Sequence, residues 1–350
     1  MRVRDTYISG IGVFLPERES IESAVQKGLL TEEKARSQGY GSATVAGELS
    51  APEMALRAAQ DALKQSGVGP DQVDLLLYAN VWHQGPDGWG PQYYLQHYLL
   101  GDDVLAVEIR HGCNGMFSGI ELGIGYLRAE EQRSAALIVG SDNFGTPMMN
   151  RWAPGGGFSV MGDGASAVLL TKEPGFAQLL SVCTATFSEM EEAHRAGEPL
   201  FPPGATTGRV LDFMVRAEAY KEKVVAEGTG SQILVRHQRC NIECTNRALA
   251  DAEIEMGDVK RAITHNISRE EAKAYLGVLG FPLERSTWGF GSGVGHLGAS
   301  DHAVSLHHLV ATGQVGPGDH VLLCGFSPGV TYKSAIVKIL EMPAWAGAPA

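Results

Sequence analysis

The sequence predicts an α/β protein built from two similar halves, and three observations support this prediction. Short apolar runs typical of strands alternate along the chain with segments of helical periodicity. A helix–turn–strand pattern occurs twice, at 58–78 and at 248–263. The chain has 350 residues, enough for two domains or one duplicated domain. We expect the halves to meet near 172–175, giving an N-terminal unit of 1–174 and a C-terminal unit of 175–350.

Each predicted strand is a short apolar run bounded by turn-forming residues. In chain order the predicted strands are 7–15, 75–80, 104–109, 135–141, 166–171, 262–266, 321–325 and 334–340. Helical spacing of apolar residues predicts helices at 51–66, 116–128, 241–255 and 299–312. The segments 82–99 and 187–237 interrupt this alternation and are expected to form walls or lids over a site. The last stretch, 342–350, is expected to be a loose tail.

Composition narrows the class of protein. The formal net charge is −12, which argues against binding to nucleic acid or to an anionic membrane surface. No apolar run approaches the ~20 residues that span a bilayer, and the first residues lack the apolar core of a signal peptide. Five cysteines in so long a chain favour a reducing compartment. We therefore expect a cytoplasmic enzyme.

Cys113 is the predicted nucleophile. It follows the strand at 104–109 and precedes the helix that begins near Met116, with Gly112 providing a tight turn. Orphan N–H groups and the dipole at a helix N-terminus favour a thiolate. The alternative is a small buried cysteine with only a packing role, which is the commoner state of a free cysteine.

Four motifs resemble the ketoacyl-ACP synthase III family of the thiolase fold. They are 108–115, 161–168, 264–268 and 325–332, they occur in the family's order, and they extend over nearly the whole chain. The resemblance implies a five-layered αβαβα fold of two pseudo-repeated halves, a homodimer, and acyl transfer through a cysteine. It implies no organic cofactor and no metal. The donor would be the phosphopantetheine thioester of acyl-CoA or of an acyl carrier protein.

Carried over by motif, Cys113 matches the acylated nucleophile and His265 matches the family's active-site histidine. Ser268 stands where the family usually has asparagine. The larger departure is His296, which occupies the position of a second catalytic asparagine. An imidazole there can accept a proton from an incoming hydroxyl or amine, and Asp301 could hold its tautomer. Asp301 could equally cap the helix that follows.

These departures favour the acyltransferase branch of the family, found in polyketide and antibiotic pathways. Such an enzyme passes the acyl group from Cys113 to a small-molecule hydroxyl or amine acceptor. The first alternative is a decarboxylating starter-unit condensing enzyme that uses malonyl carrier protein, with His265 and His296 stabilising an enolate. The second is a non-catalytic thiolase-fold subunit, against which the two histidines argue.

Other candidate residues line the predicted site. Backbone N–H groups of Cys113 and Gly329 are expected to form the oxyanion hole. Arg151 and Trp152 resemble the rim that holds a CoA nucleotide in the family, although a plain surface arginine is the alternative. The predicted substrate-binding residues are Trp82, Trp89, Arg151, Trp152, Ser268 and Phe326. His237, Cys240 and Cys244 have metal-like spacing, but a structural zinc takes four ligands, so core packing is preferred and no metal is predicted.

Overall fold

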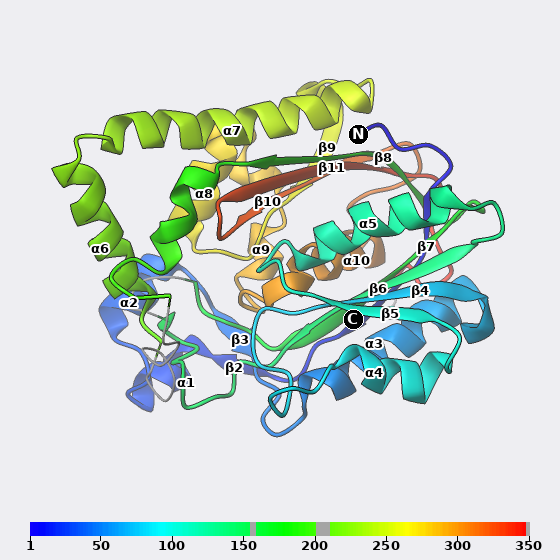
Figure 1. The fold of residues 1–350 in the computed structure, drawn as a ribbon, viewed down its shortest axis with the longest axis horizontal. Coiled ribbons are helices and arrows are strands. Elements are labelled where there is room, and N and C mark those ends of the chain that lie inside the picture. Colours follow the sequence, from blue (N-terminus) through cyan, green and yellow to red (C-terminus); the bar gives the residue numbers. More distant parts are fainter. Residues whose placement is uncertain (155–158, 201–210, 348–350) are drawn as a thin grey trace.

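The computed structural model describes residues 1–154, 159–200 and 211–347 (Figure 1). In this part of the chain a single mixed sheet has nine strands. From one edge to the other the strands are β5 (Leu105–Ile109), β4 (Val73–Ala79), β6 (Ala135–Asp142), β7 (Gly164–Thr171), β1 (Tyr7–Phe14), β8 (Ala177–Thr186), β11 (Thr331–Ile339), β10 (His320–Ser327) and β9 (Val259–Ile263). β4 is parallel to β5 and β6, β9 is parallel to β10, and the remaining pairs are antiparallel.

Helices cover the outer faces of this sheet and also pack between its two parts. They are α1 (Ile21–Gln26), α2 (Glu32–Gln38), α3 (Ala51–Ser66), α4 (Gln92–Leu95), α5 (Gly115–Ala129), α6 (Phe213–Ala226), α7 (Gly230–Asp251), α8 (Arg269–Val278), α9 (Trp288–Gly291) and α10 (Asp301–Ala311). A separate two-stranded sheet pairs β2 (Arg18–Ser20) with β3 (Ser42–Thr44).

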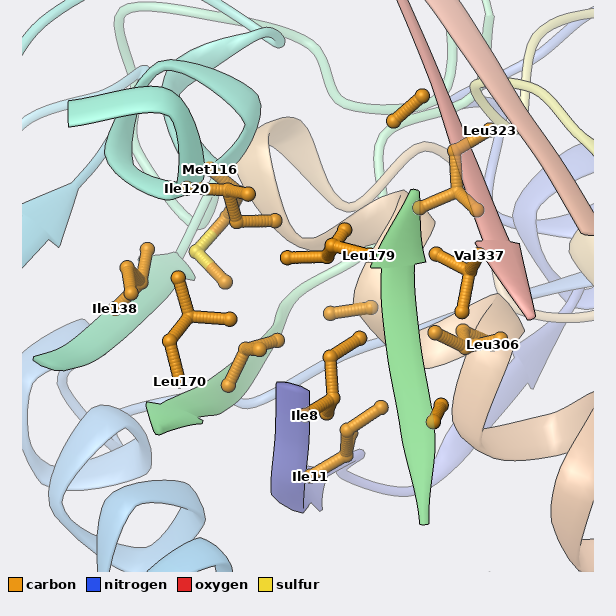
Figure 2. Close-up of a cluster of buried hydrophobic side chains, with 14 of the residues drawn as sticks. Ile8, Ile11, Met116, Ile120, Ile138, Leu170, Leu179, Leu306, Leu323 and Val337 are labelled. Atoms are coloured by element: carbon orange, nitrogen blue, oxygen red, sulfur yellow. The ribbon is translucent and has the colours of Figure 1, made fainter. Parts of the chain in front are cut away.

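The elements stack in five layers. α3 packs on β1, β6 and β7, whereas α7 packs on β8 and β11 at the opposite outer face (Figure 1). α5 and α10 lie between the two parts of the sheet. Figure 2 shows the core that they form there, with Ile120 of α5 beside Met116 and Leu306 of α10 beside Val337 of β11. This αβαβα arrangement is the predicted fold class.

Most of the predicted elements are present, and the segment 187–237, which interrupts the predicted alternation, is more helical than its sequence indicates. Instead of being irregular throughout, the described part of that segment contains α6 and the first turns of α7, while 201–210 lie outside the described residues. The helical pattern is hidden because valines and leucines also lie on the exposed faces, as at Val225 and Leu234. β8 was missed because buried Ser181 interrupts its apolar pattern, its hydroxyl donating to the Ala248 carbonyl.

The C-terminal stretch is also more ordered than predicted. The Trp345 ring stacks on His307 at a centroid distance of 4.6 Å and meets Phe176 edge-on. Residues 348–350 lie outside the described part. None of the helices in the described ranges is long and apolar enough to cross a membrane. The division at 174/175 stays a prediction.

Candidate active site

The loop between β5 and α5 presents Cys113. Gly112 has φ +53°, a left-handed conformation that suits glycine, and it turns the chain sharply before the cysteine. A Cβ at Gly112 would lie 3.0 Å from Pro328 Cδ and 3.3 Å from Ser327 Cβ. The nucleophile turn therefore packs directly against the end of β10 and the loop after it, and a larger residue at this position would require that loop to shift.

Cys113 is joined to His296 and Asp301 in a continuous chain of contacts. Its Sγ lies 3.0 Å from Nε2 of His296, and Nδ1 of the same ring contacts Oδ2 of Asp301. A carboxylate only accepts hydrogen bonds, so Nδ1 carries a proton and Nε2 faces the sulfur. The arrangement is that of a nucleophile, a base and an orienting carboxylate.

Backbone N–H groups fix the Asp301 carboxylate. Oδ2 accepts from Asn266 N–H at 2.9 Å, and Oδ1 accepts from Leu297 N–H at 2.8 Å. The side chain is fully buried at the first position of α10, and Ser300, the N-cap residue before it, makes no side-chain capping hydrogen bond. The capping alternative is therefore wrong, because both oxygens of Asp301 are used by the site and by the loops that carry it.

His265 follows β9 and approaches the same carboxylate less closely. Its Nδ1 is 3.5 Å from Asp301 Oδ2, and its Nε2 is 3.3 Å from Oδ1 of Asn114. Asn114, which follows Cys113, donates from Nδ2 to the Thr331 carbonyl at 2.9 Å. Because Asn114 Oδ1 accepts, His265 is protonated on Nε2. Asn114 thus links His265 to Thr331 at the start of β11.

The two histidines differ in charge. Burial is the largest influence on His296 and lowers its pKa, but the negative charges of Asp301 and Cys113 outweigh it and hold the pKa well above the usual value. Burial likewise raises the pKa of Asp301, but the charge of His296 and its hydrogen bond to the carboxylate keep that pKa below its ordinary range. Burial lowers the pKa of His265, which stays neutral. The resting site thus favours a His296 imidazolium beside the sulfur.

Two buried residues near this cluster were not predicted. The His302 ring lies 4.5 Å from that of His265, its Nε2–H donates to the Cys324 carbonyl, and burial lowers its pKa to about 3. Asp142 accepts N–H groups of Val81 and Trp82 at 2.8 Å each. Their contacts join segments far apart in the chain, so spacing in the sequence gives no signal for them.

Asp142 also adjoins the loop that carries His296. Gly298 has φ +59°, and a Cβ there would lie 2.2 Å from Asp142 Oδ2. The same carboxyl receives the Ala299 N–H at 3.4 Å, and burial raises its pKa to about 7. Asp142 therefore links Val81, which lies shortly after β4, to the loop between His296 and Asp301.

A cavity of about 220 Å³ opens at Cys113. This is below the ~300–1,000 Å³ of pockets that enclose a drug-sized ligand, so it suits an acyl group rather than a whole CoA thioester. Its lining is mainly apolar and consists of Val81, Gly112, Cys113, Pro154, Ser159, Met161, His194, Phe213, His265, Ile267, Glu271, His296, Phe326, Ser327 and Pro328. A larger groove of about 580 Å³ lies around Trp288 and Arg269, and no residue of the Cys113–His296–Asp301 chain lines it.

The structure places the predicted substrate-binding residues unevenly. Phe326 lines the cavity, whereas Trp82, Trp89 and Ser268 are not among its lining residues. Trp82 packs with the cluster of Phe144, Met149 and Met161, and Trp89 is 39% exposed. Ser268 caps α8, donating from Oγ to Glu271. The predicted pairing of the Cys113 and Gly329 N–H groups in an oxyanion hole stays a prediction.

Arg151 and Trp152 do not form the expected exposed rim. Both are buried, and Arg151 Nη1 lies 2.7 Å from Oδ2 of Asp163, whose Oδ1 accepts the Phe144 N–H. Trp152 packs with Ile21, Leu30 and Tyr40 in a separate apolar cluster. A buried arginine paired with a carboxylate inside the fold is already satisfied, so its surroundings indicate a structural role.

Replacing Arg151 with alanine is expected to destabilise the protein. Arg151→Ala leaves Asp163 as an unpaired buried charge, which costs about 3–5 kcal/mol in the free energy of unfolding. Arg36→Ala, which breaks an ion pair with Glu32 between largely exposed side chains, is the control and should cost at most about 1 kcal/mol. Urea unfolding measures both. An unchanged stability combined with a raised KM for acyl-CoA would instead restore the nucleotide-rim role.

Three side chains of the site are of types that also bind metal ions. Donor atoms of His265, His296 and Asp301 lie within 4.8 Å of one another. The same atoms already face hydrogen-bonding partners, as Asp301 Oδ2 accepts the Asn266 N–H and His296 Nε2 faces Cys113. Hydrogen bonding accounts for the geometry, and the absence of a metal requirement stays a prediction.

Comparison with known proteins identifies the family. Residues 107–205 match the family model for 3-oxoacyl-[acyl-carrier-protein] synthase III, and residues 249–339 match its C-terminal model. The chain is 26% identical over 342 residues to β-ketoacyl-[acyl-carrier-protein] synthase III 3 of Streptomyces coelicolor, covering 95% of this chain and 96% of that protein. It is 23% identical over 336 residues to the β-ketoacyl-[acyl-carrier-protein] synthase III of Clostridium perfringens, covering 95% and 98%.

Solved structures agree. The structure of ChlB3, described as an acyltransferase, is 48% identical, covers 97% of this chain and 99% of that chain, and superposes with a TM-score of 0.91. The 3-oxoacyl-[acyl-carrier-protein] synthase III of Aquifex aeolicus is 20% identical, with 95% and 99% coverage and a TM-score of 0.73, and so shares the fold. The chain therefore belongs to the 3-oxoacyl-[acyl-carrier-protein] synthase III family of thiolase-like enzymes.

Proposed function

We propose that this protein is an acyltransferase that loads an acyl group onto Cys113 and passes it to a hydroxyl or amine acceptor. The observation that carries the proposal is the chain of contacts from Cys113 through His296 to Asp301. A base held by a buried carboxylate is what transfer to a protic acceptor requires. The 48% identity to the ChlB3 acyltransferase supports the same chemistry.

Loading begins with the resting ion pair. The Cys113 thiolate attacks the carbonyl carbon of a thioester on CoA or on an acyl carrier protein, forming a new C–S bond. Backbone N–H groups at Cys113 and Gly329 would hold the oxyanion. Collapse breaks the bond to the pantetheine sulfur, which takes the Nε2 proton of His296. The products are acyl-Cys113, a neutral His296 and a free pantetheine thiol.

Discharge reverses the charges. Acylation removes the negative charge of the sulfur, one of the two that raise the pKa of His296, so the neutral imidazole can act as a base. His296 takes the proton of the acceptor as its oxygen or nitrogen attacks the acyl carbon. The tetrahedral intermediate expels the Cys113 thiolate, and the imidazolium that remains is paired with Asp301. His265 would hold Asn114 and help to position the acyl carbonyl.

The direct test is intact-protein mass after incubation with a panel of acyl-CoAs, with the adduct mapped by peptide analysis. The proposal requires a stable adduct on Cys113 that is lost when an acceptor alcohol or amine is added. Absence of an adduct with every CoA and with acylated carrier protein would contradict the proposal and favour a non-catalytic role. Cytoplasmic localisation and the absence of a cofactor remain part of the proposal.

Decarboxylative condensation is the second candidate, because His265 and His296 both lie at the nucleophile with their ring centroids 5.5 Å apart. An enolate requires neutral hydrogen-bond donors, whereas a neutral His296, with its Nδ1 proton held by Asp301, presents Nε2 as a proton acceptor in the acyl-enzyme. We therefore expect acylated enzyme to release no ¹⁴CO₂ from malonyl carrier protein labelled in its free carboxyl group. Release dependent on Cys113 would make condensation the activity.

We also propose a homodimer that is joined along β5. This edge strand exposes Leu105 and Val107 on one face, and the neighbouring α5 exposes Leu122. An apolar edge strand pairs readily with another chain. Leu105→Lys combined with Val107→Glu should convert a dimer to a monomer in light scattering, whereas Leu234→Lys, at an exposed leucine of α7, should not. A wild-type monomer would refute the dimer.

The division of the chain at 174/175 is likewise proposed. In the strand order β1, β4, β5, β6 and β7 lie on one side of the β1–β8 junction, and β8–β11 lie on the other. This order supports two units whose inner helices, α5 and α10, each follow an active-site residue.

A further inference from the structure

We propose that the cavity at Cys113 selects an acyl group that carries a hydroxyl substituent, and that His194 and Ser327 bind this hydroxyl. The inference rests on the proposed function, because it assigns the cavity to the acyl group. It concerns specificity rather than catalysis. The observation behind it is a pair of buried polar atoms that the fold leaves without partners.

Most of the polar side chains that line the cavity are already satisfied. His296 contacts Asp301, His265 contacts Asn114, Glu271 accepts from Ser268, and Ser159 bonds to Tyr40. By contrast, Ser327 Oγ and His194 Nδ1 are buried and have no hydrogen-bond partner among the described residues. His265 Nδ1 also lacks a hydrogen bond there, but it faces the Asp301 carboxylate at 3.5 Å, whereas no charged group in the described part of the chain is paired with Ser327 Oγ or His194 Nδ1. Two unsatisfied atoms in the wall of one cavity are unusual, because buried polar groups are nearly always paired.

Both side chains belong to well-fixed segments. Ser327 ends β10, is 2% exposed, and lies beside the Gly112 turn. His194 ends the 3₁₀ segment Ser188–His194, and its carbonyl accepts from Arg216 Nη1 at 3.0 Å. Both atoms are shielded from bulk water by the fold. A ligand that fills the cavity must satisfy both atoms or bear the cost of their desolvation.

The chemistry of the wall defines the ligand. The rest of the lining is apolar, with Val81, Met161, Ile267 and Phe326 among its members. Burial lowers the pKa of His194, so its ring is neutral and one nitrogen can accept a hydrogen bond. Ser327 can donate or accept. A hydroxyl, which does both, complements the pair, whereas a purely hydrocarbon acyl chain leaves both atoms unpaired.

Binding to Cys113→Ala tests the inference separately from catalysis, because this variant cannot be acylated. Calorimetry would compare two matched pairs of CoA thioesters: 3-hydroxybutanoyl with butanoyl, and 4-hydroxybenzoyl with benzoyl. At least one hydroxylated member should bind about tenfold or more tightly than its partner. Adding His194→Ala or Ser327→Ala should reduce that ratio to about threefold or less, mainly by weakening the hydroxylated member.

Three variants act as controls. His194→Gln and Ser327→Thr keep a hydrogen-bonding group and should retain part of the preference. Ser305→Ala removes another unpartnered buried hydroxyl, one outside the cavity lining, and should leave the ratio unchanged. Equal affinities within both pairs, no binding by any member, or a preference that survives His194→Ala and Ser327→Ala together would overturn the inference. Failure of the proposed acyl transfer would appear instead as the absence of a mass adduct on wild-type enzyme.

Discussion

Cys113→Ala is expected to abolish covalent loading and to lower the rate of acyl transfer at least about a thousandfold. The Cys113 sulfur lies 3.0 Å from His296 Nε2, and alanine has no nucleophilic atom to replace it. Intact-protein mass spectrometry should find no adduct with any acyl-CoA that labels the wild type. An adduct of unchanged yield would refute the proposed mechanism.

Cys240→Ala is the matched control for this experiment. Cys240 is also a free, half-buried thiol, but it lies on α7 away from the cavity lining, so its loss should leave loading intact. The pKa of His296 provides a second test of Cys113→Ala. Because the charge of Cys113 helps to raise that pKa, the substitution should lower it, as measured by NMR titration of the imidazole. The shift would report the ion pair independently of substrate.

The sequence predicts the skeleton of the site well, since its residues occur in short motifs attached to regular elements. Cys113 follows a strand and precedes a helix, His265 follows β9, and His296 and Asp301 precede the body of α10. Five-residue spacing made contact between His296 and Asp301 plausible, and the structure shows that contact. Local sequence predicts the positions of these residues because each motif lies at the end of a strand or helix that the same motif helps to define.

The residues around that skeleton could not be predicted, because their positions depend on tertiary contacts. Asp142 and Val81 are 61 positions apart, and nothing local marks the carboxylate as a partner of that N–H. Arg151 was predicted to bind the CoA nucleotide from its place in the sequence, but in the structure it forms a buried ion pair with Asp163. His194 lies in a segment expected only to cover the site, and its unsatisfied nitrogen is visible only once the fold is known.

Asp301→Asn is expected to slow discharge of acyl-Cys113 by about 10³- to 10⁴-fold while leaving the adduct able to form. Asparagine can still contact His296, but it cannot neutralise the imidazolium that forms as the acceptor loses its proton. It can also donate to Nδ1, which selects the wrong tautomer. Single-turnover decay of the preloaded acyl-enzyme, with an alcohol acceptor and with water alone, measures the effect.

The pH profile separates this positioning role from a merely structural one. Discharge needs neutral His296, so its rate should rise with pH through the pKa of that imidazole in the acyl-enzyme. Asp301 is one of the charges that raise this pKa, so in Asp301→Asn the rising limb should move to lower pH even as the plateau falls. His296→Ala should remove the limb altogether. If Asp301 served only to hold the backbone at Asn266 and Leu297, the Asn variant would lose stability and its limb would stay where it is in the wild type. A lowered plateau with an unmoved limb would therefore assign Asp301 to the scaffold and leave His296 without its proposed electrostatic partner.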